Sequence, residues 1–508
     1  MKKLAQVVLL FAAVLFSRVV HAQIADTEKY DEPYRLQVHF SPRAHWVNDP
    51  NGMVYFKHTY HLFFQYYPGG KNWGPMHWGH AVSTDLVHWQ ELPIALYPDS
   101  LGYIFSGSAV VDSNNTTGFG KDGIVPLVAI FTHHDPKGEQ TGKDNFQNQS
   151  LAYSLDEGLT WTKYSCNPVL KNPGIRDFRD PKVCWFAPAK KWVMTLATKD
   201  KVTFYSSPDL KSWTKESEFG KKTGAHGGVW ECPDMFKLTL DGKVYWILSV
   251  NMNPGGPNGG SATQYFIGQF NGTTFTPIDD KTRWLDYGPD EYAGVTWSNT
   301  GKRILFLGWM SNWSYAGQVP TNKWRNAMTS PRQLSLKNID SNLLLCSNLV
   351  QEFDHIKQKE ITIGSKVLAG QVMKGLPHQY LLKLRASMAH SFSVTFSNAS
   401  NNQLVFGYNK STNQYYVDRS RSGKIDFNPD FGKVSYAPRF SRASISDIKV
   451  LFDASSIEVF ADKGLSTMTS VYFAGRPFDQ LQISRQKGGV SVAKIIPLKS
   501  IWRQYAIK

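Results

Sequence analysis

Short runs of apolar and aromatic residues alternate with turn residues over much of the chain. From about residue 30 to residue 340, runs rich in Val, Ile, Phe, Tyr and Trp are separated by Gly, Asn, Asp and Pro, and helical periodicity is almost absent. Residues 54–56 and 61–66 form one pair of runs joined by a tight turn, and residues 191–196 and 202–205 form another. Short strands with regular turn signals predict an all-β sandwich, barrel or propeller.

An internal repeat distinguishes between these architectures. The segment Ser-Thr-Asp-Leu-Val-His-Trp at residues 83–89 recurs at residues 154–161 and 207–213, and a looser copy spans residues 270–275. The closing aromatic residues lie 72, 52 and 62 residues apart, which fits one four-stranded blade with long loops. A unit of about 60 residues, repeated over about 310, predicts a five-bladed β-propeller at residues 30–345.

The composition changes after about residue 355. Tryptophan becomes rare, and alternating strands such as residues 391–396, 448–452 and 457–461 predominate. We therefore predict that residues 355–508 form a second all-β domain, most simply a β-sandwich, and that residues 340–360 are the connection.

Polar motifs follow the phase of the repeat. Asp49 lies in Trp-Val-Asn-Asp-Pro-Asn-Gly, Asp180 in Arg-Asp-Pro, and Glu231 in Trp-Glu-Cys-Pro-Asp. They precede the closing aromatic residues of their units by 40, 33 and 44 residues. The second unit opens with Phe105-Ser106-Gly107 and the fifth with Tyr292-Ala293-Gly294. Since the first strand of each blade lines the central channel of a propeller, we expect the three carboxylates to converge on one funnel.

Pro50 shapes the expected backbone of the first motif. A proline favours an extended conformation at the preceding residue and cannot donate to a strand ladder. We therefore expect Asp49 to be the last residue of a strand, although Asp-Pro-Asn-Gly by itself is more typical of a plain turn.

Converging carboxylates suit the cleavage of a glycosidic bond. One carboxylic acid protonates the leaving oxygen while a second carboxylate acts at the anomeric carbon. Glu231 has the longer side chain and is the better acid, which leaves Asp49 as the nucleophile. Asp180 would bind sugar hydroxyls and be kept ionised by Arg179, although an isolated Arg-Asp pair is more typical of a salt bridge or a cap. Aromatic residues make up 14% of the chain, and those near the carboxylates are candidates for sugar contact.

Four of these motifs, in this order and spacing, resemble those of glycoside hydrolase family 32, which contains invertases, levanases and inulinases. They are the motifs at residues 46–52, 105–107, 179–181 and 231–233. The resemblance covers most of residues 35–340, and residues 453–460 followed by Gly464 are similar to the C-terminal sandwich signature of that family. One departure is Val47, where methionine is common, and both residues are apolar. The resemblance implies a five-bladed propeller with a C-terminal sandwich that acts on fructan and sucrose substrates without a cofactor.

The resemblance also implies roles for individual residues. Asp49 would be the nucleophile of a retaining reaction, Asp180 the transition-state stabiliser and Glu231 the acid/base. Seven further residues would line the fructosyl pocket, namely Asn48, Gln65, Trp73, Phe105, Ser106, Arg179 and Trp313. Residues 72–88 and 97–111 are most similar to bacterial exo-acting levanases and inulinases, which implies release of terminal fructose.

Other functions stay open from the sequence. The inverting five-bladed arabinan and xylan hydrolases also use two Asp and one Glu, but they lack the Trp-x-Asn-Asp-Pro-Asn-Gly stretch. A non-catalytic sugar-binding propeller is a second alternative, which the loss of any one carboxylate would indicate. A transfructosylase is a third, and the sequence does not rank levan, inulin and sucrose.

Residues 1–22 have the features of a secretory signal peptide. Lys2 and Lys3 precede an apolar run at residues 4–16, and the segment ends in Val-His-Ala. We expect a mature start near Gln23, a secreted or periplasmic protein and no integral membrane segment. The formal net charge is +15 and is +12 without this segment, but the basic residues form no arm or stripe. We therefore expect no nucleic-acid partner, and we expect a monomer.

The chain has four cysteines, and no CxxC or Cys/His spacing of a metal site is present. We expect Cys232, directly after Glu231, to be a buried free thiol and expect no metal site. Pairing among Cys166, Cys184 and Cys346 stays open.

Overall fold

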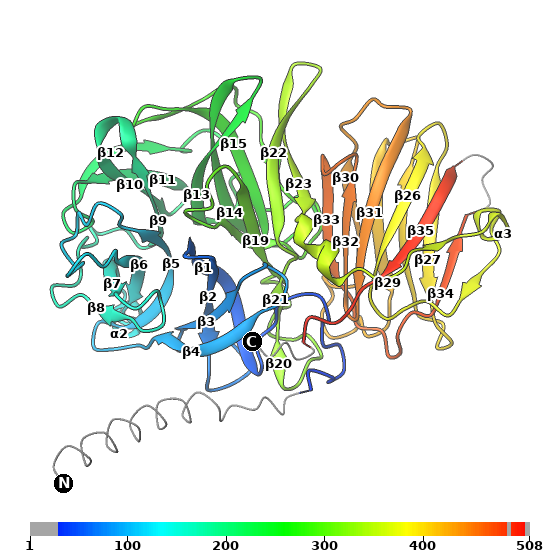
Figure 1. Ribbon diagram of the computed structural model, residues 1–508, viewed down its shortest axis with the longest axis horizontal. Coiled ribbons are helices and arrows are strands. Elements are labelled where there is room, and N and C mark those ends of the chain that lie inside the picture. The colour runs from blue at the N-terminus through cyan, green and yellow to red at the C-terminus, as the bar shows by residue number, and fades with distance from the viewer. Residues whose placement is uncertain (1–28, 485–488, 503–508) are drawn as a thin grey trace, which may run out of the picture. The chain divides into compact units, whose positions relative to one another are not determined.

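The computed structural model describes residues 29–484 and 489–502. The predicted signal peptide and the predicted mature start near Gln23 lie outside these residues. Within the described part of the chain, no helix is both long and apolar enough to cross a membrane. The elements are almost entirely strands, arranged in five sheets of four or five strands and two sheets of six (Figure 1).

The first five sheets are the blades of a β-propeller, as the repeat predicts. Blade 1 contains β1 (His45–Phe56), β2 (Thr59–Tyr67), β3 (His77–Ser83) and β4 (Gln90–Leu96). Blade 2 contains β5 (Tyr103–Val111), β6 (Leu127–His134), β7 (Gln147–Ser154) and β8 (Thr162–Lys163), with α2 (Pro136–Gln140) after β6. Blade 3 contains β9 (Phe178–Phe186), β10 (Lys191–Thr198), β11 (Lys201–Ser207) and β12 (Thr214–Phe219), with a 3-10 turn η1 (Ala187–Ala189) after β9.

Blades 4 and 5 complete the circle. Blade 4 contains β13 (Val229–Leu240), β14 (Lys243–Asn253), β15 (Ala262–Phe270), β16 (Phe275–Pro277) and β17 (Arg283–Trp284). Blade 5 contains β18 (Tyr292–Thr296), β19 (Ile304–Met310), β21 (Ala327–Met328), β22 (Arg332–Ile339) and β23 (Asn342–Leu349). The short β20 (Trp324–Arg325) pairs in parallel with β1, so a segment of blade 5 joins the last blade to the first.

The sequence repeat is the turn that leads to the outermost strand of a blade. In blade 1, Ser83 donates to the Asp85 carboxylate, and the indole of Trp89 donates to the Leu86 carbonyl at 3.1 Å. Blades 2 and 3 repeat both contacts, with indole bonds of 3.0 Å from Trp161 and 2.9 Å from Trp213. The repeated residues therefore fix the same corner of successive blades.

The innermost strand of every blade carries a bulge at its polar motif. The pairing register shifts between Val47 and Pro50 in blade 1 and between Ile104 and Gly107 in blade 2. Equivalent shifts lie opposite residues 179–182 in blade 3 and within residues 231–234 and 292–295 in blades 4 and 5. A bulge leaves its extra residue out of the ladder and re-aims the side chain. The motifs thus place one polar residue per blade at the same level of the channel.

One local prediction is wrong. Asp49 is the fifth residue of the twelve-residue strand β1 and does not end it. The bulge accommodates Pro50 within the strand, because the bulged position needs no ladder donor. A turn at Asp-Pro-Asn-Gly does not form.

Two six-stranded sheets form the C-terminal β-sandwich. A connection with the 3-10 turn η2 (Gln351–Ile356) leads into it. The first sandwich sheet has the order β24 (Ile361–Thr362), β35 (Val490–Pro497), β26 (Tyr380–Ser387), β31 (Ile445–Asp453), β32 (Ser456–Ala461) and β33 (Ser466–Val471). The second has the order β25 (Met373–Lys374), β34 (Gln480–Ile483), β27 (Phe392–Ser397), β28 (Gln403–Asn409), β29 (Gln414–Arg421) and β30 (Val434–Pro438), and α3 (Ser365–Leu368) precedes β25.

Buried ion pairs join the propeller to the sandwich. Arg332 of β22 has a side chain with no exposed surface and bonds both to Asp286 and to Glu458 of β32. His39, ahead of β1, lies between Asp453 at 2.7 Å and Glu458 at 2.9 Å. Removing one partner of such a buried set leaves an uncompensated charge, so these groups fix the two folds against each other.

Candidate active site

Asp49 is held by donors from its own strand and from the next blade. The Asn48 amide donates to Asp49 Oδ1 at 2.9 Å, and the Ser106 hydroxyl of β5 donates to Asp49 Oδ2 at 2.7 Å. Asn48 is in turn fixed by the Trp46 indole, whose Nε1 donates to Asn48 Oδ1 at 2.7 Å. Burial and the nearby Glu231 carboxylate raise the pKa of Asp49, while the Asn48 and Ser106 bonds act in the opposite direction. The two donors therefore favour the ionised carboxylate that a nucleophile needs.

Cys232 of β13 lies between the carboxylates of blades 1 and 3. Its backbone N–H donates to Asp180 Oδ2 at 2.9 Å, and its Sγ is 3.5 Å from Asp49 Oδ2 and 3.6 Å from Asp180 Oδ2. Cys232 is a buried free thiol, as predicted, and burial together with the carboxylates raises its pKa well above the ordinary value. The protonated thiol is a weak donor to both carboxylates. One residue of blade 4 thereby brings Asp49 and Asp180 together.

Glu231 is bonded on both of its oxygens. Arg179 of β9 donates to Glu231 Oε1 at 3.0 Å, and the hydroxyl of Tyr292 in β18 donates to Oε2. Arg179 is itself fixed by a 2.6 Å bond to Asp177. Residues of blades 3 and 5 therefore orient this carboxylate of blade 4 next to the Asp49 and Asp180 pair.

Asp180 titrates in an unusual range for an aspartate. Burial raises its pKa to about 7, although Arg179 acts to lower it, because the Glu231 and Asp49 carboxylates add to the effect of burial. Arg179 therefore favours the ionised form of Asp180, as expected, but burial and the two neighbouring carboxylates outweigh its effect on the pKa. The guanidinium comes only within 3.9 Å of Asp180 and makes its short bonds to Asp177 and Glu231 instead. Asp180 also has a left-handed backbone, with φ of 65°, which the bulge imposes.

The remaining predicted pocket residues belong to blades 1, 2 and 5. Gln65 of β2 is buried, and within the described chain its amide nitrogen has no hydrogen-bond partner. Trp73 is 45% exposed and meets Phe105 edge to face at 6.1 Å between ring centroids. Trp313 stacks on Trp46 at 5.9 Å. The aromatic rings thus contact one another in two pairs, Trp73 with Phe105 and Trp313 with Trp46.

Tyr292 was not among the predicted site residues. It opens the fifth repeat unit in the same phase as Asp49, Ser106, Asp180 and Glu231, so the phase of the repeat alone could have identified it. Burial and Glu231 raise the pKa of Tyr292 well above the ordinary value, so its hydroxyl remains a donor.

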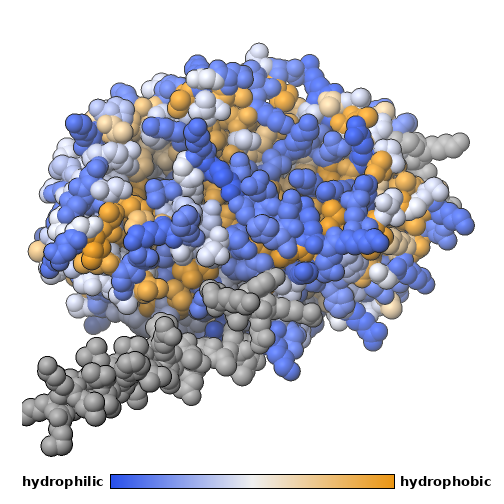
Figure 2. All heavy atoms as spheres, in the orientation of Figure 1, coloured by the Kyte–Doolittle hydropathy of each residue, from blue (hydrophilic) through white to orange (hydrophobic). Residues whose placement is uncertain are grey.

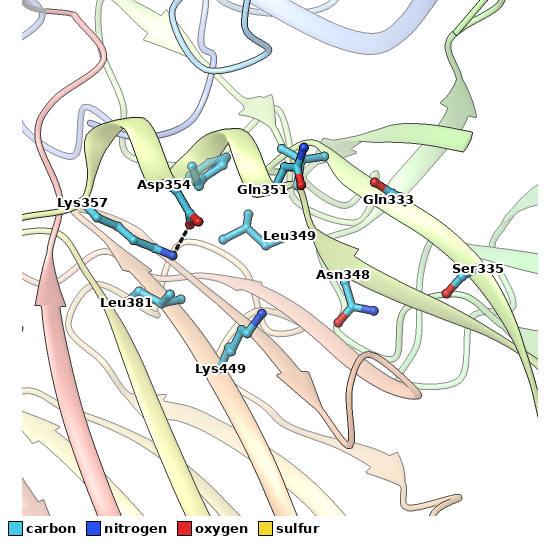
Figure 3. Close-up of a pocket in the computed structure, with 11 residues that line it drawn as sticks. Gln333, Ser335, Asn348, Leu349, Gln351, Asp354, Lys357, Leu381 and Lys449 are labelled. Carbon is cyan, nitrogen blue, oxygen red and sulfur yellow. Dashed lines mark hydrogen bonds and ion pairs between the residues drawn. The ribbon is translucent and has the colours of Figure 1, made fainter. Parts of the chain in front are cut away.

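Other candidate sites do not involve these residues. A cavity of about 310 Å³ lies between blade 5, the η2 connection and the sandwich, lined by groups that include Asn348, Asp354, Lys357 and Lys449 (Figure 3). None of the ten predicted site residues lines it.

Cys166, Cys184 and Cys346 are free thiols. In the described residues, no group of three or more His, Cys, Asp or Glu is placed to hold a metal ion. On the face shown in Figure 2, hydrophobic residues form separate patches among hydrophilic ones.

Comparisons with known proteins agree with this geometry. Residues 39–347 match the model of the glycosyl hydrolases family 32 N-terminal domain, and residues 348–499 match that of the family 32 C terminal. A levanase of Bacillus subtilis is 46% identical over 99% of this chain and 76% of its own. An extracellular exo-inulinase of Aspergillus niger is 42% identical over 89% of this chain and 92% of its own. The crystal structure of an exo-inulinase of Aspergillus awamori, 37% identical, superposes with a TM-score of 0.86 over 93% of this chain and all of its own.

Proposed function

Because the chain belongs to glycoside hydrolase family 32, we propose that it removes terminal β-D-fructofuranosyl residues from fructans and sucrose with retention of configuration. The observation that carries the proposal is the convergence of Asp49, Asp180 and Glu231, from three blades, around Cys232 and Arg179. The similarity to a levanase and to exo-inulinases over most of the chain supports fructans as substrates and exo action.

In the first half of the reaction, Asp49 attacks the anomeric carbon of the terminal fructose while Glu231 protonates the glycosidic oxygen. The carbon–oxygen bond breaks, the rest of the chain leaves as an alcohol, and a fructosyl ester of Asp49 remains. The Asn48 and Ser106 donors keep the attacking carboxylate ionised and fix its direction. In the second half, ionised Glu231 takes a proton from water, which attacks the same carbon and releases fructose and free Asp49.

Asp180 and the residues that line the pocket contact the sugar ring, and they do not contact the glycosidic bond that breaks. With a pKa of about 7, Asp180 accepts hydrogen bonds from sugar hydroxyls best in its ionised form, and Arg179 lies close enough to favour that form. The free Gln65 amide donates to another hydroxyl, while Trp73, Phe105 and Trp313 cover the apolar faces of the ring. These contacts hold the anomeric carbon in line with Asp49.

We further propose that the protein acts outside the cytoplasm as a monomer. The basis for the location is the signal-peptide pattern of residues 1–22 and the extracellular exo-inulinases among its relatives. Sedimentation of the mature protein and its recovery from periplasmic or medium fractions test these two points.

Two variants test the roles of the carboxylates. Asp49→Asn and Glu231→Gln should both lose sucrose hydrolysis by several orders of magnitude, because each removes an essential group. On an aryl fructoside whose leaving group needs no proton, Glu231→Gln should give a burst of one aryl alcohol per enzyme, and Asp49→Asn should give none.

Glu218→Gln, on the outer strand β12, is the matched control and should retain full activity. Thermal melts establish that all variants fold. Substantial sucrose turnover in a folded Asp49→Asn variant would exclude Asp49 as the nucleophile.

A further inference from the structure

The outer face of the second sandwich sheet carries two neighbouring tyrosines. The inward positions of its strands are apolar and buried, such as Phe392, Val394 and Phe396 in β27. The outward positions are mostly Ser, Thr, Gln, Asn and Asp, as expected for a solvated face. Tyr416 of β29 and Tyr436 of β30 are the two aromatic side chains at these outward positions, and Tyr436 is 47% exposed. An aromatic side chain of this kind on a polar face calls for a separate explanation.

The two tyrosines lie close together because of the pairing of their strands. Tyr416 and Tyr436 are direct cross-strand partners. The N–H and C=O of Tyr436 bond not to Tyr416 but to the Asn258 side chain, both at 2.9 Å. They therefore form a non-hydrogen-bonded pair, the type in which opposite side chains are closest.

Gly407 of β28 gives the Tyr416 ring room to lie flat on the sheet. It is the cross-strand partner of Tyr416, and a Cβ at Gly407 would lie only 2.5 Å from the Tyr416 ring. The Tyr416 ring therefore lies partly buried over β28, and the more exposed Tyr436 lies on the other side of β29, so the two side chains span the three strands. We call Tyr416 and Tyr436 the tyrosine platform.

The tyrosine platform is continuous with the rim of the candidate active site. Asn258 belongs to the loop of residues 254–261, which follows the end of β14, and that end pairs with the Glu231 end of β13. The same loop contacts the segment that carries Trp313, since Trp313 N donates to Ser261 Oγ at 3.2 Å. A second sandwich residue, Asn428, bonds that segment at Ser314 and Gln318, both at 2.9 Å.

We propose that the tyrosine platform binds the part of a fructan chain that extends out of the pocket when its terminal fructose is bound. Tyrosine rings present flat apolar faces that pack against the C–H faces of sugars. The neighbouring Ser, Thr, Asn and Gln side chains offer hydrogen bonds to sugar hydroxyls. This inference rests on the proposed function, because it takes the fructan substrate and the position of the pocket from it.

The chain length of the substrate separates the platform from the catalytic centre. The double variant Tyr416→Ala/Tyr436→Ala should raise the KM for high-molecular-weight levan and inulin about tenfold, given two lost aromatic contacts. Its kcat on these polymers should stay within a factor of two. The kinetic constants for sucrose should also stay within about a factor of two, because a disaccharide does not extend beyond the rim. Tyr416→Phe/Tyr436→Phe keeps the rings and should restore the low KM.

A binding measurement makes the result independent of catalysis. In native gels that contain levan, the Asp49→Asn protein should be retarded, and adding the two Tyr→Ala changes should abolish most of the retardation. If the wild-type enzyme does not cleave sucrose but is still retarded in this way, the proposed function fails and the platform stands. Equal losses on sucrose and polymer, or a folded double Ala variant with wild-type KM and retardation, would overturn the platform.

Discussion

Replacing Ser106 by alanine should move the acid limb of the rate profile to higher pH. The Ser106 hydroxyl donates to Asp49 Oδ2 at 2.7 Å, and its residue is only 4% exposed. This bond acts to lower the pKa of Asp49 against burial and the Glu231 charge, which raise it. Catalysis needs ionised Asp49, so a variant without the donor loses activity at a higher pH than the wild type does.

The size of the change follows from the type of hydrogen bond. A hydrogen bond to a charged group contributes about 1.5–3 kcal/mol. The Asn48 donor remains, and water can enter the space that the hydroxyl leaves, so we expect the lower end of this range. At about 1.4 kcal/mol per pH unit, the acid limb should shift upward by about one unit.

The assay is the pH dependence of kcat/KM for sucrose, which reports the ionisations of the free enzyme. Ser108→Ala is the matched control, since Ser108 lies two residues further along β5, is 3% exposed and donates to the Pro181 carbonyl at 2.8 Å. It should lower stability without moving the acid limb. An unchanged limb in Ser106→Ala, or an equal shift in both variants, would refute the reasoning.

Three further predictions concern the site, the stability and the product. Tyr292→Phe removes the hydroxyl that donates to Glu231 and should lower kcat about 10- to 100-fold with little change in KM. Stopped assays on sucrose measure both constants, and an unchanged kcat would exclude this orienting role. Burial alone would lower the pKa of His39, but bonds to Asp453 and Glu458 raise it to about 9. The protonated side chain therefore contributes about 3 kcal/mol to the free energy of unfolding, and this contribution is complete below pH 6.5 and is lost as the pH rises to 9. The Tm of His39→Gln should accordingly depend less on pH between 7 and 10 than that of the wild type, and parallel curves would contradict this. Early samples of a levan digest should contain free fructose and almost no oligosaccharides, whereas a ladder of oligosaccharides would indicate endo cleavage.

The sequence predicted the blades and the convergence of the three carboxylates because these depend on local patterns. The Ser-x-Asp turns and their closing aromatic residues recur in blades 1 to 3, with a looser copy in blade 4, so their spacing gives the length of one blade. Asp49 and Glu231 each stand beside or near a proline in the innermost strand. Their phase within the repeat is enough to bring them to one channel.

The details of the site depend on contacts between blades, which a single sequence does not display. Pro50 suggested a strand end, but the bulge in β1 accommodates it. Arg179 was assigned to its sequence neighbour Asp180, yet its guanidinium reaches Glu231 in the next blade. The pKa of Asp180 is set by burial and by carboxylates 131 and 51 residues away, so its direction could not be read from adjacent residues.

The stereochemistry of the first product tests the central claim most directly. If Asp49 is the nucleophile, the fructosyl ester forms with one inversion and is hydrolysed with a second, so fructose is released as the β-anomer. NMR spectra in the first seconds of sucrose turnover distinguish this anomer before mutarotation. The account predicts β-fructofuranose as the initial product. An initial α-anomer would make Asp49 a base that activates water, and would contradict the account.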